Sequence, residues 1–287
     1  MATFETSLKS RLIYVFAISD EWHKDCLKVG ETTLEEDDGN FPLPNSEVLN
    51  KAACDRIDQY TKTAGIAYTL LHTEMTVFFK GGTISSFNDK QVHSVLERSG
   101  VKKKTFDTVK GANEWFCCDL ETIKKAIHAV KNGQNSLNAS EISHTQTPII
   151  FRPEQQAAID KTKKQFKKGS QMLWNAKMRF GKTLCALRVA RDLDMRRTII
   201  LTHRPVVDEG WFEDFGKIFY DRTDYHYGSR TKGEDFDSLE RLAKKGGKYV
   251  YFASMQDMRG AQLVGGKFDK NNEVFSTEWD FLIVDEA

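Results

Sequence analysis

The residues best suited to chemistry lie in the middle of the chain: Asn175, Ala176, Lys177, Met178, Arg179, Phe180, Gly181, Lys182 and Thr183. From Ala176 onward they read A-x-x-x-x-G-K-T, the spacing of a phosphate-binding loop with alanine in place of its first glycine. In such a loop backbone N–H groups surround the phosphates, Lys182 reaches the β and γ oxygens, and the Thr183 hydroxyl takes one position on Mg²⁺. We therefore predict an ATP·Mg²⁺ site at residues 176–183.

An acidic pair follows an apolar run at the other end of this region. Phe281-Leu282-Ile283-Val284 is followed by Asp285 and Glu286, about a hundred residues after the G-K-T. In ATPases a strand closed by Asp-Glu holds Mg²⁺ through the Asp and polarises the attacking water through the Glu. We therefore assign Asp285 to the metal and Glu286 to catalysis.

Three further motifs resemble those of superfamily 2 helicases. Arg152 and Gln155, in Phe151-Arg152-Pro153-Glu154-Gln155, resemble the adenine-reading element R-x-x-Q. The same run is also an ordinary helix N-terminus with proline at its first position. Thr202, His203 and Arg204 stand where such helicases contact the DNA backbone, and Gln256 stands in a run that resembles their T-x-Q element. The resemblance implies ATP binding by the first pair and DNA binding by the other four.

Residues 149–287 look most like the helicase subunits of type III-like restriction systems. Asp285-Glu286-Ala287 is similar to the start of a DEAD/DEAH box, and no fourth residue or second RecA-like domain follows it. We therefore expect an N-terminal fragment of a longer protein. A small-molecule kinase with a G-K-T loop is a disfavoured alternative, because it does not require the other motifs.

Four runs and one arginine stand out in the first part of the chain: Ile13-Tyr14-Val15, Leu27-Lys28-Val29-Gly30-Glu31-Thr32, Asp89-Lys90-Gln91-Val92-His93, Asn113-Glu114-Trp115-Phe116, and Arg56. Together they resemble a GIY-YIG nuclease, in the phage-associated subfamily with K-[IV]-G-x-T, and Arg56 matches its catalytic arginine. The resemblance implies that Tyr14 positions or activates water, that Lys28 stands at the catalytic position of the second tyrosine, and that Arg56 neutralises the scissile phosphate. Asp89 would hold Mg²⁺ or Mn²⁺.

Two departures leave a second function open. Lys28 replaces the second tyrosine of the motif, and Asp89 is one methylene shorter than the usual glutamate. A displacement of about 1 Å can cost on the order of a hundredfold in rate. The alternative is therefore a DNA translocase or remodeller whose degenerate GIY-YIG-like domain only binds DNA or a partner.

The elements that position these residues fall into two α/β domains. For residues 1–130, a small mixed α/β domain, we predict strands at 11–18, 26–30 and 67–79 and helices at 47–61, 89–98 and 119–133. The stretch 131–148 is polar and reads as a linker. For residues 149–287, a partial RecA-like domain, we predict helices at 154–168, 183–190 and 206–215 and strands at 171–174, 198–201, 249–252 and 281–284. Continuous apolar strands between helices favour a parallel sheet covered on both faces.

Composition adds little about partners. The 287 residues carry a net charge of +1 and 40% hydrophobic residues, with no signal peptide and no apolar run of membrane length. The five cysteines form no C-x-x-C pair, which argues against a zinc site or a disulfide framework and suits a reducing cytoplasm. We expect a cytoplasmic protein without membrane contact. Its expected partners are double- or single-stranded DNA and a methyltransferase or defence-system subunit.

Overall fold

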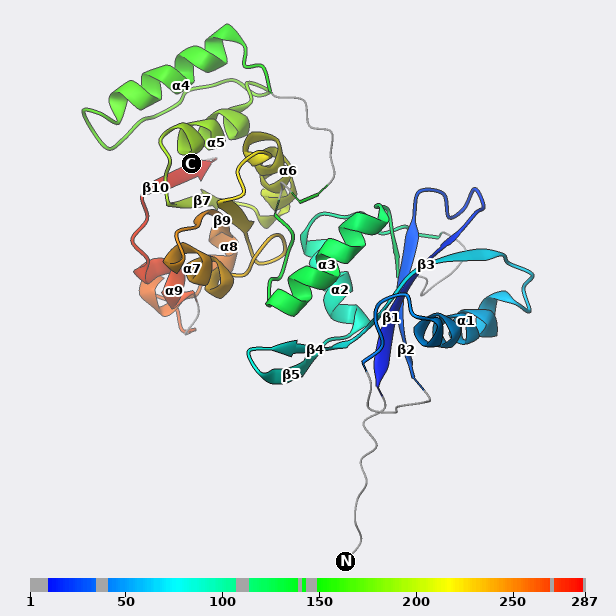
Figure 1. Cartoon of the computed structure of the whole chain (residues 1–287). Coiled ribbons are helices and arrows are strands. Elements are labelled where there is room, and N and C mark those ends of the chain that lie inside the picture. Colours follow the sequence, from blue (N-terminus) through cyan, green and yellow to red (C-terminus); the bar gives the residue numbers. More distant parts are fainter. Residues whose placement is uncertain are drawn as a thin grey trace, which may run out of the picture. The chain divides into compact units, whose positions relative to one another are not determined.

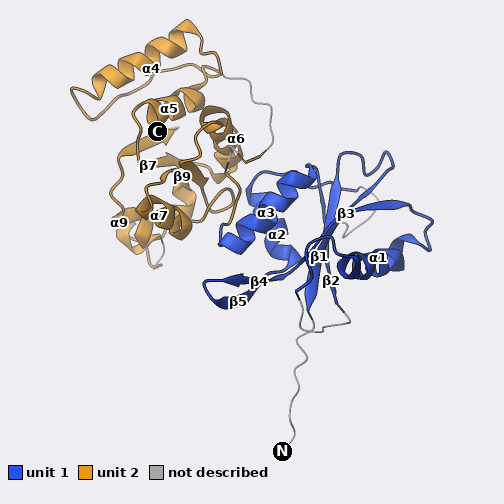
Figure 2. Ribbon diagram, viewed as in Figure 1, with its two compact units in different colours: residues 1–134 blue, residues 135–287 orange. Residues whose placement is uncertain are grey.

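The computed structural model describes residues 10–34, 41–106, 114–138, 141–142, 149–268 and 271–285. The chain divides between Gln134 and Asn135 into two units, each with its own four-stranded sheet (Figure 2). None of the helices within these ranges is long and apolar enough to cross a membrane. Both units mix helices and strands, as the α/β prediction requires.

The sheet of unit 1 is antiparallel, with the strand order β3-β1-β2-β6. Its strands are β1 (Arg11–Ile18), β2 (Leu27–Thr33), β3 (Tyr68–Met75) and β6 (Trp115–Phe116). The predicted hairpin of β1 and β2 is confirmed. One predicted strand, 67–79, is in fact two, because the chain changes partner at Thr76: its N–H still donates to the carbonyl of Arg11, whereas its own carbonyl accepts the N–H of Phe87. Beyond it, β4 (Val77–Lys80) pairs with β5 (Thr83–Ser86).

Helices cover both faces of this sheet (Figure 1). Leu12, Tyr14 and Phe16 of β1 share one core with α1 (Glu47–Thr61), because alternate strand residues point to the same side. The opposite side packs against α2 (Asp89–Arg98) and α3 (Leu120–Asn132). The predicted ends of α3 are confirmed: the Asp119 carboxylate accepts the Thr122 N–H, and Gly133 ends the helix with φ 71°.

The sheet of unit 2 is parallel, with the strand order β10-β7-β9-β8. Its strands are β7 (Arg197–Thr202), β8 (Tyr225–Gly228), β9 (Lys248–Ser254) and β10 (Phe281–Asp285). Its helices are α4 (Pro153–Gln165), α5 (Lys182–Asp192), α6 (Asp208–Phe219), α7 (Phe236–Lys244), α8 (Met255–Met258) and α9 (Asn272–Ser276), with 3₁₀ turns at Pro205–Val207 and Gln262–Val264.

Both faces of this sheet are buried, as predicted. Ile200 and Val250 face α5 and α6, whereas Ile199 and Tyr251 face α7 and α9. The sequence prediction missed β8, because Tyr225-His226-Tyr227-Gly228 is short and lies between polar turns. Each strand therefore contributes apolar residues to two cores, which is why the strands of this unit read as continuous apolar runs.

The predicted strand Gln171–Trp174 does not form. These residues are irregular, and the side chain of Leu173 is 90% exposed. Within the described residues β10 pairs only with β7, so no strand supplies Gln171–Trp174 with a ladder. Trp174 instead docks on α4, donating its indole N–H to the Thr162 hydroxyl at 2.8 Å. Apolar composition alone was insufficient, because a strand also needs a hydrogen-bonded neighbour.

Candidate functional site

The first candidate site lies on the α1 face of unit 1. The Tyr14 ring lies over Gly30, where a Cβ would meet its Cζ at 2.7 Å. Glycine is therefore required opposite Tyr14 in β2. The hydroxyl of Tyr14 is 3.5 Å from that of Tyr60, which the sequence analysis missed. Tyr60 follows Arg56 by one turn of α1, and i, i+4 spacing is the signal that could have found it.

Charged groups surround these two phenols. Lys28 Nζ lies 4.6 Å from the Tyr60 ring centroid and 3.3 Å from the Glu114 carboxylate. Burial raises the pKa of Tyr14, while the Tyr60 hydrogen bond and the charge of Arg56 oppose that rise. Burial and the hydrogen bond with Tyr14 also raise the pKa of Tyr60. The structure thus brings Tyr14, Lys28 and Arg56 together, with Tyr60 and Glu114 added, and keeps both phenols protonated near neutral pH.

Asp89 lies apart from this cluster. Its backbone N–H donates to Glu31, which also pairs with Arg11 at 3.0 Å. In β2 the side chain of Glu31 points to the face opposite that of Lys28 and Gly30. Among the described residues no hydrogen bond or ion pair joins Asp89 to Tyr14, Lys28 or Arg56, and no three acidic, histidine or cysteine side chains gather as metal ligands.

In unit 2 the predicted phosphate-binding loop, residues 176–183, ends in a sharp turn into α5. Arg179 has φ 61° and Gly181 has φ 87°, both in the left-handed region. A Cβ on Gly181 would lie 2.7 Å from the Gln155 amide nitrogen, so both its φ and its surroundings favour glycine here. Lys182 and Thr183 are the first residues of α5, where backbone N–H groups lack helical partners and the helix dipole is positive.

The start of α4 is tied to this loop. Arg152 Nη2 and Gln155 Nε2 donate to the carbonyl of Phe180 at 2.9 and 2.6 Å. Gln155 Oε1 accepts the N–H of Arg152 at 2.8 Å. Both the oxygen and the nitrogen of the Gln155 amide thus form hydrogen bonds within the chain, and the side chain is buried. These contacts position the loop; adenine reading by Arg152 and Gln155 stays a prediction.

The remaining predicted residues lie at the carboxyl edge of the sheet. Thr202 of β7 is opposite Asp285 of β10 on one side and Ser254 of β9 on the other. Because α5 ends shortly before β7 begins, its first turn points to this same edge. Thr202 is only 1% exposed and donates to the carbonyl of Arg204, so its hydroxyl shapes the loop. His203, Arg204 and Gln256 are exposed.

Several cations here have no acidic partner. Lys177, Arg179, Lys182 and Arg204 are exposed, and none of them forms an ion pair with another residue of the described ranges. Ala176 and Phe180 are half-buried and Met178 is 91% exposed. Glu286 lies outside the described residues. The edge therefore offers positive charge, free N–H groups and one acidic strand end.

Comparison with known proteins agrees with this arrangement. Residues 148–287 match the family model described as type III restriction enzyme, res subunit. This match supports a restriction-type helicase domain in this part of the chain. A candidate type II restriction enzyme and methyltransferase (C-terminus) of Mycoplasma pneumoniae is 29% identical over 143 residues, which is 47% of this chain and 19% of that protein. The chain thus spans about a fifth of that relative's length.

The helicase-type domain has the donor set that ATP·Mg²⁺ requires. Thr183 and Asp285 supply hydroxyl and carboxylate oxygens, the hard ligands that Mg²⁺ prefers. Both lie at the carboxyl edge of the sheet, Thr183 in the first turn of α5 and Asp285 at the end of β10. These two residues would hold Mg²⁺, which would supply positive charge to neutralise the phosphates.

Proposed function

We propose that the chain couples an ATP-driven DNA helicase or translocase to a metal-dependent DNA endonuclease of GIY-YIG type, in restriction or phage defence. The observation that carries the first half is the carboxyl edge of unit 2, where a phosphate loop and cations without acidic partners meet. A methyltransferase or another defence-system subunit is the expected partner, in keeping with the description of the relative.

In the helicase-type domain each residue has a distinct task. The N–H groups at the start of α5 and the ammonium group of Lys182 bind phosphate, and Gln155 fixes the loop through Phe180. Thr183 and Asp285 hold Mg²⁺, and Glu286 orients the attacking water. Exposed His203, Arg204 and Gln256 contact the nucleic-acid strand next to the nucleotide. ATP turnover and strand movement are thereby joined at one edge of the sheet.

In unit 1 the exposed members of the cluster would contact DNA. Tyr14 is 3% exposed, so it acts on Tyr60 through its hydroxyl rather than on the substrate. Tyr60 and Arg56 are exposed. Lys28 lies at the Tyr60 ring. Arg56 and Lys28 would bind the scissile phosphate, and Tyr60 would orient the attacking water.

One observation favours the alternative function. Asp89, the proposed ligand of Mg²⁺ or Mn²⁺, is hydrogen-bonded to Glu31 on the other face of β2. We call Tyr14, Lys28, Arg56, Tyr60 and Glu114 the phenol cluster. If no metal binds at the phenol cluster, unit 1 binds DNA or a partner without cutting it. The chain is then a translocase or remodeller with a recognition module.

A nicking assay on residues 1–287 with supercoiled DNA decides between the two. A nuclease nicks with Mg²⁺ or Mn²⁺ and not with EDTA. Arg56→Ala then loses on the order of a hundredfold in rate while DNA affinity falls only a few-fold, since the guanidinium acts mainly on developing charge. Lys51→Ala, also on α1, is the matched control and keeps full rate. Binding without metal-dependent nicking by the wild-type chain would establish the alternative.

A further inference from the structure

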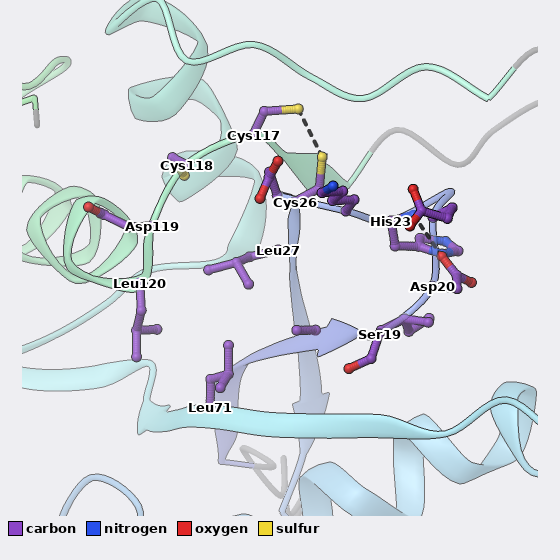
Figure 3. A pocket seen from close by; sticks show the side chains of 15 residues that line it. Ser19, Asp20, His23, Cys26, Leu27, Leu71, Cys117, Cys118, Asp119 and Leu120 are labelled. Carbon is purple, nitrogen blue, oxygen red and sulfur yellow. Dashed lines mark hydrogen bonds and ion pairs between the residues drawn. The ribbon is translucent and has the colours of Figure 1, made fainter. Parts of the chain in front are cut away.

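Cys26 and Cys117 are far apart in the sequence and side by side in unit 1. Their Sγ atoms lie 2.9 Å apart across a separation of 91 residues (Figure 3). The β2–β6 ladder aligns Leu27 with Phe116 and Lys28 with Trp115. One step further along this register places Cys26 opposite Cys117.

The backbone at this position suits a covalent bond between the two sulfurs. The N–H of Val29 donates to the carbonyl of Glu114, which marks that pair as hydrogen-bonded. Alternation along an antiparallel ladder then puts Cys26 and Cys117 at a non-hydrogen-bonded position, where Cα atoms are about 4.5 Å apart. Disulfides span Cα separations of about 4.4–6.8 Å. The bond can therefore form with little movement of either strand.

The two thiols differ in access. Cys117 is exposed, whereas Cys26 is 4% exposed. Both line an open recess of about 990 Å³ beside the turn between β1 and β2, together with Lys24 and Cys118. Burial and the hydrogen bond with Cys117 raise the pKa of Cys26 to about 12. Cys117 is therefore the thiol that meets a reagent first, because the thiolate is the reactive form and needs access.

We propose that Cys26 and Cys117 are a redox modification site, oxidised to a reversible disulfide by exchange with a small-molecule disulfide such as glutathione disulfide. The Cys117 thiolate attacks one sulfur, forms a mixed disulfide and releases one glutathione thiolate. Cys26 then attacks Cys117 Sγ and releases a second glutathione, which takes up the Cys26 proton. Two protein thiols are oxidised, and one glutathione disulfide is reduced to two glutathiones.

The bond would fix β6 to β2 beside the phenol cluster. The described ladder between these strands consists of Leu27–Phe116 and Lys28–Trp115. Lys28 of this ladder forms an ion pair at 3.3 Å with Glu114, which directly precedes β6. Oxidation therefore restricts the two segments that carry these residues. This inference does not depend on unit 1 being a nuclease.

The test equilibrates the full 287-residue chain with glutathione disulfide, alkylates the remaining thiols and maps linked peptides by mass spectrometry. We expect Cys26 joined to Cys117 in the wild type and in the controls Cys54→Ser and Cys118→Ser. Cys26→Ser should stop at the mixed disulfide on Cys117, and Cys117→Ser should give neither product. Oxidation should raise the melting temperature by on the order of 10 °C in the wild type and in both controls, and not in Cys26→Ser or Cys117→Ser.

Three results would overturn the proposal, and all are read from the wild-type chain, so a variant that fails to fold does not matter. The first is a link between Cys117 and Cys118. The second is a mixed disulfide on Cys117 that persists without an internal link. The third is no oxidation of either cysteine in excess glutathione disulfide.

Discussion

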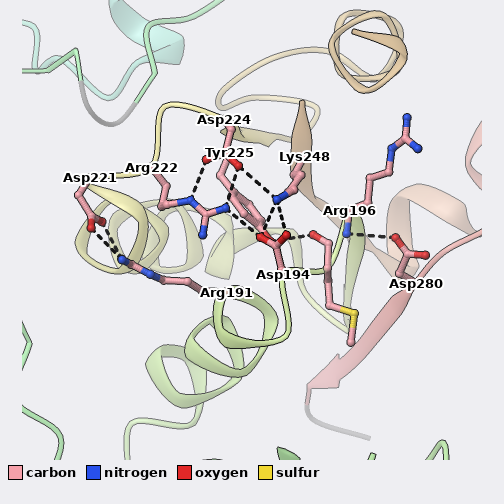
Figure 4. Close-up of polar contacts among 10 residues, drawn as sticks. Arg191, Asp194, Arg196, Asp221, Arg222, Asp224, Tyr225, Lys248 and Asp280 are labelled. Carbon is pink, nitrogen blue, oxygen red and sulfur yellow. Dashed lines mark hydrogen bonds and ion pairs between the residues drawn. The ribbon is translucent and has the colours of Figure 1, made fainter. Parts of the chain in front are cut away.

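The unit 2 sheet has an amino edge, where its parallel strands begin, and a carboxyl edge, where they end. Both edges carry charged residues, but the two differ in whether these residues form ion pairs within the chain. At the amino edge, Arg222 bonds to Asp194 at 2.9 Å and to Asp224 at 2.7 Å, and Lys248 joins the same two carboxylates (Figure 4). Arg191 forms a bidentate ion pair with Asp221, with N···O distances of 2.7 and 2.8 Å. At the carboxyl edge Lys177, Arg179, Lys182 and Arg204 have no such partners within the described residues. Pairing inside the chain thus distinguishes charges that hold the fold from charges available to a ligand.

At the amino edge, polar contacts connect the segments that precede the strands. Asp280, just before β10, accepts the N–H groups of Arg196 and Arg197 at 3.1 and 2.9 Å. The Arg222 guanidinium holds the pKa of Asp224 well below its usual range, and Lys248 and Arg222 lower that of Asp194. These carboxylates are ionised at neutral pH and their charge is already neutralised. These carboxylates are therefore not available to bind a metal, and their cationic partners are not available to bind a phosphate.

The largest difference between the two edges should appear in nucleotide affinity, when Lys182→Ala at the carboxyl edge is compared with a variant at the amino edge. Removing this charge should weaken ATP·Mg²⁺ binding by about 10- to 100-fold, because a charge-assisted contact to phosphate is lost. Titration calorimetry on residues 1–287 measures it, with Lys248→Ala at the amino edge as the matched control. Equal loss of nucleotide affinity in both variants would contradict the distinction between the two edges.

Glu286→Gln should keep nucleotide binding and lose ATP hydrolysis.

A smaller effect is expected for DNA. Arg204→Ala should lower affinity a few-fold and reduce the slope of log affinity against log salt by about 0.9, because one phosphate contact releases about one counterion. Arg222→Ala at the amino edge should leave both quantities unchanged. Fluorescence anisotropy at several salt concentrations provides the comparison. A slope that does not change in Arg204→Ala, or changes in Arg222→Ala, contradicts the assignment.

The smallest effect is on stability. Arg222→Ala should cost about 1 kcal/mol at neutral pH, since Asp194 and Asp224 are 57% and 39% exposed and solvent screens the pairs. A carboxylate whose folded pKa is lowered stabilises the fold above its unfolded pKa of about 4 and loses this as pH falls towards the folded pKa. Urea unfolding should therefore show a smaller difference between wild type and variant at pH 3 than at pH 7. A constant difference would exclude these ion pairs as its cause.

The sequence was informative where a local pattern determines structure. Asp119 and Gly133 marked the ends of α3, and Gly181-Lys182-Thr183 marked the start of α5, because caps and tight turns depend on neighbouring residues. Continuous apolar runs correctly predicted three of the parallel strands. The same reasoning was wrong at Gln171–Trp174, since a run of apolar residues does not say whether a neighbouring strand exists.

What escaped prediction depends on contacts between distant segments. Tyr60 reaches Tyr14 only because α1 packs on β1, and Cys26 meets Cys117 only through the β2–β6 register. The ion pairs and hydrogen bonds of the amino edge join residues from Arg191 to Asp280 with no periodic pattern. The motif at Thr202 was recognisable, but the direction of its buried hydroxyl was not. Motifs name residue types, and only packing determines which of them face a ligand.

The most direct test of the central claim is hydrogen exchange on residues 1–287 with and without a non-hydrolysable ATP analogue and Mg²⁺. The account predicts slower exchange at the backbone amides of Gly181, Lys182 and Thr183, which would bind phosphate, and no change at residues 191–197 and 221–225. Lys182→Ala should abolish the protection. Protection confined to the amino edge, or none in the phosphate loop at saturating analogue, would contradict it.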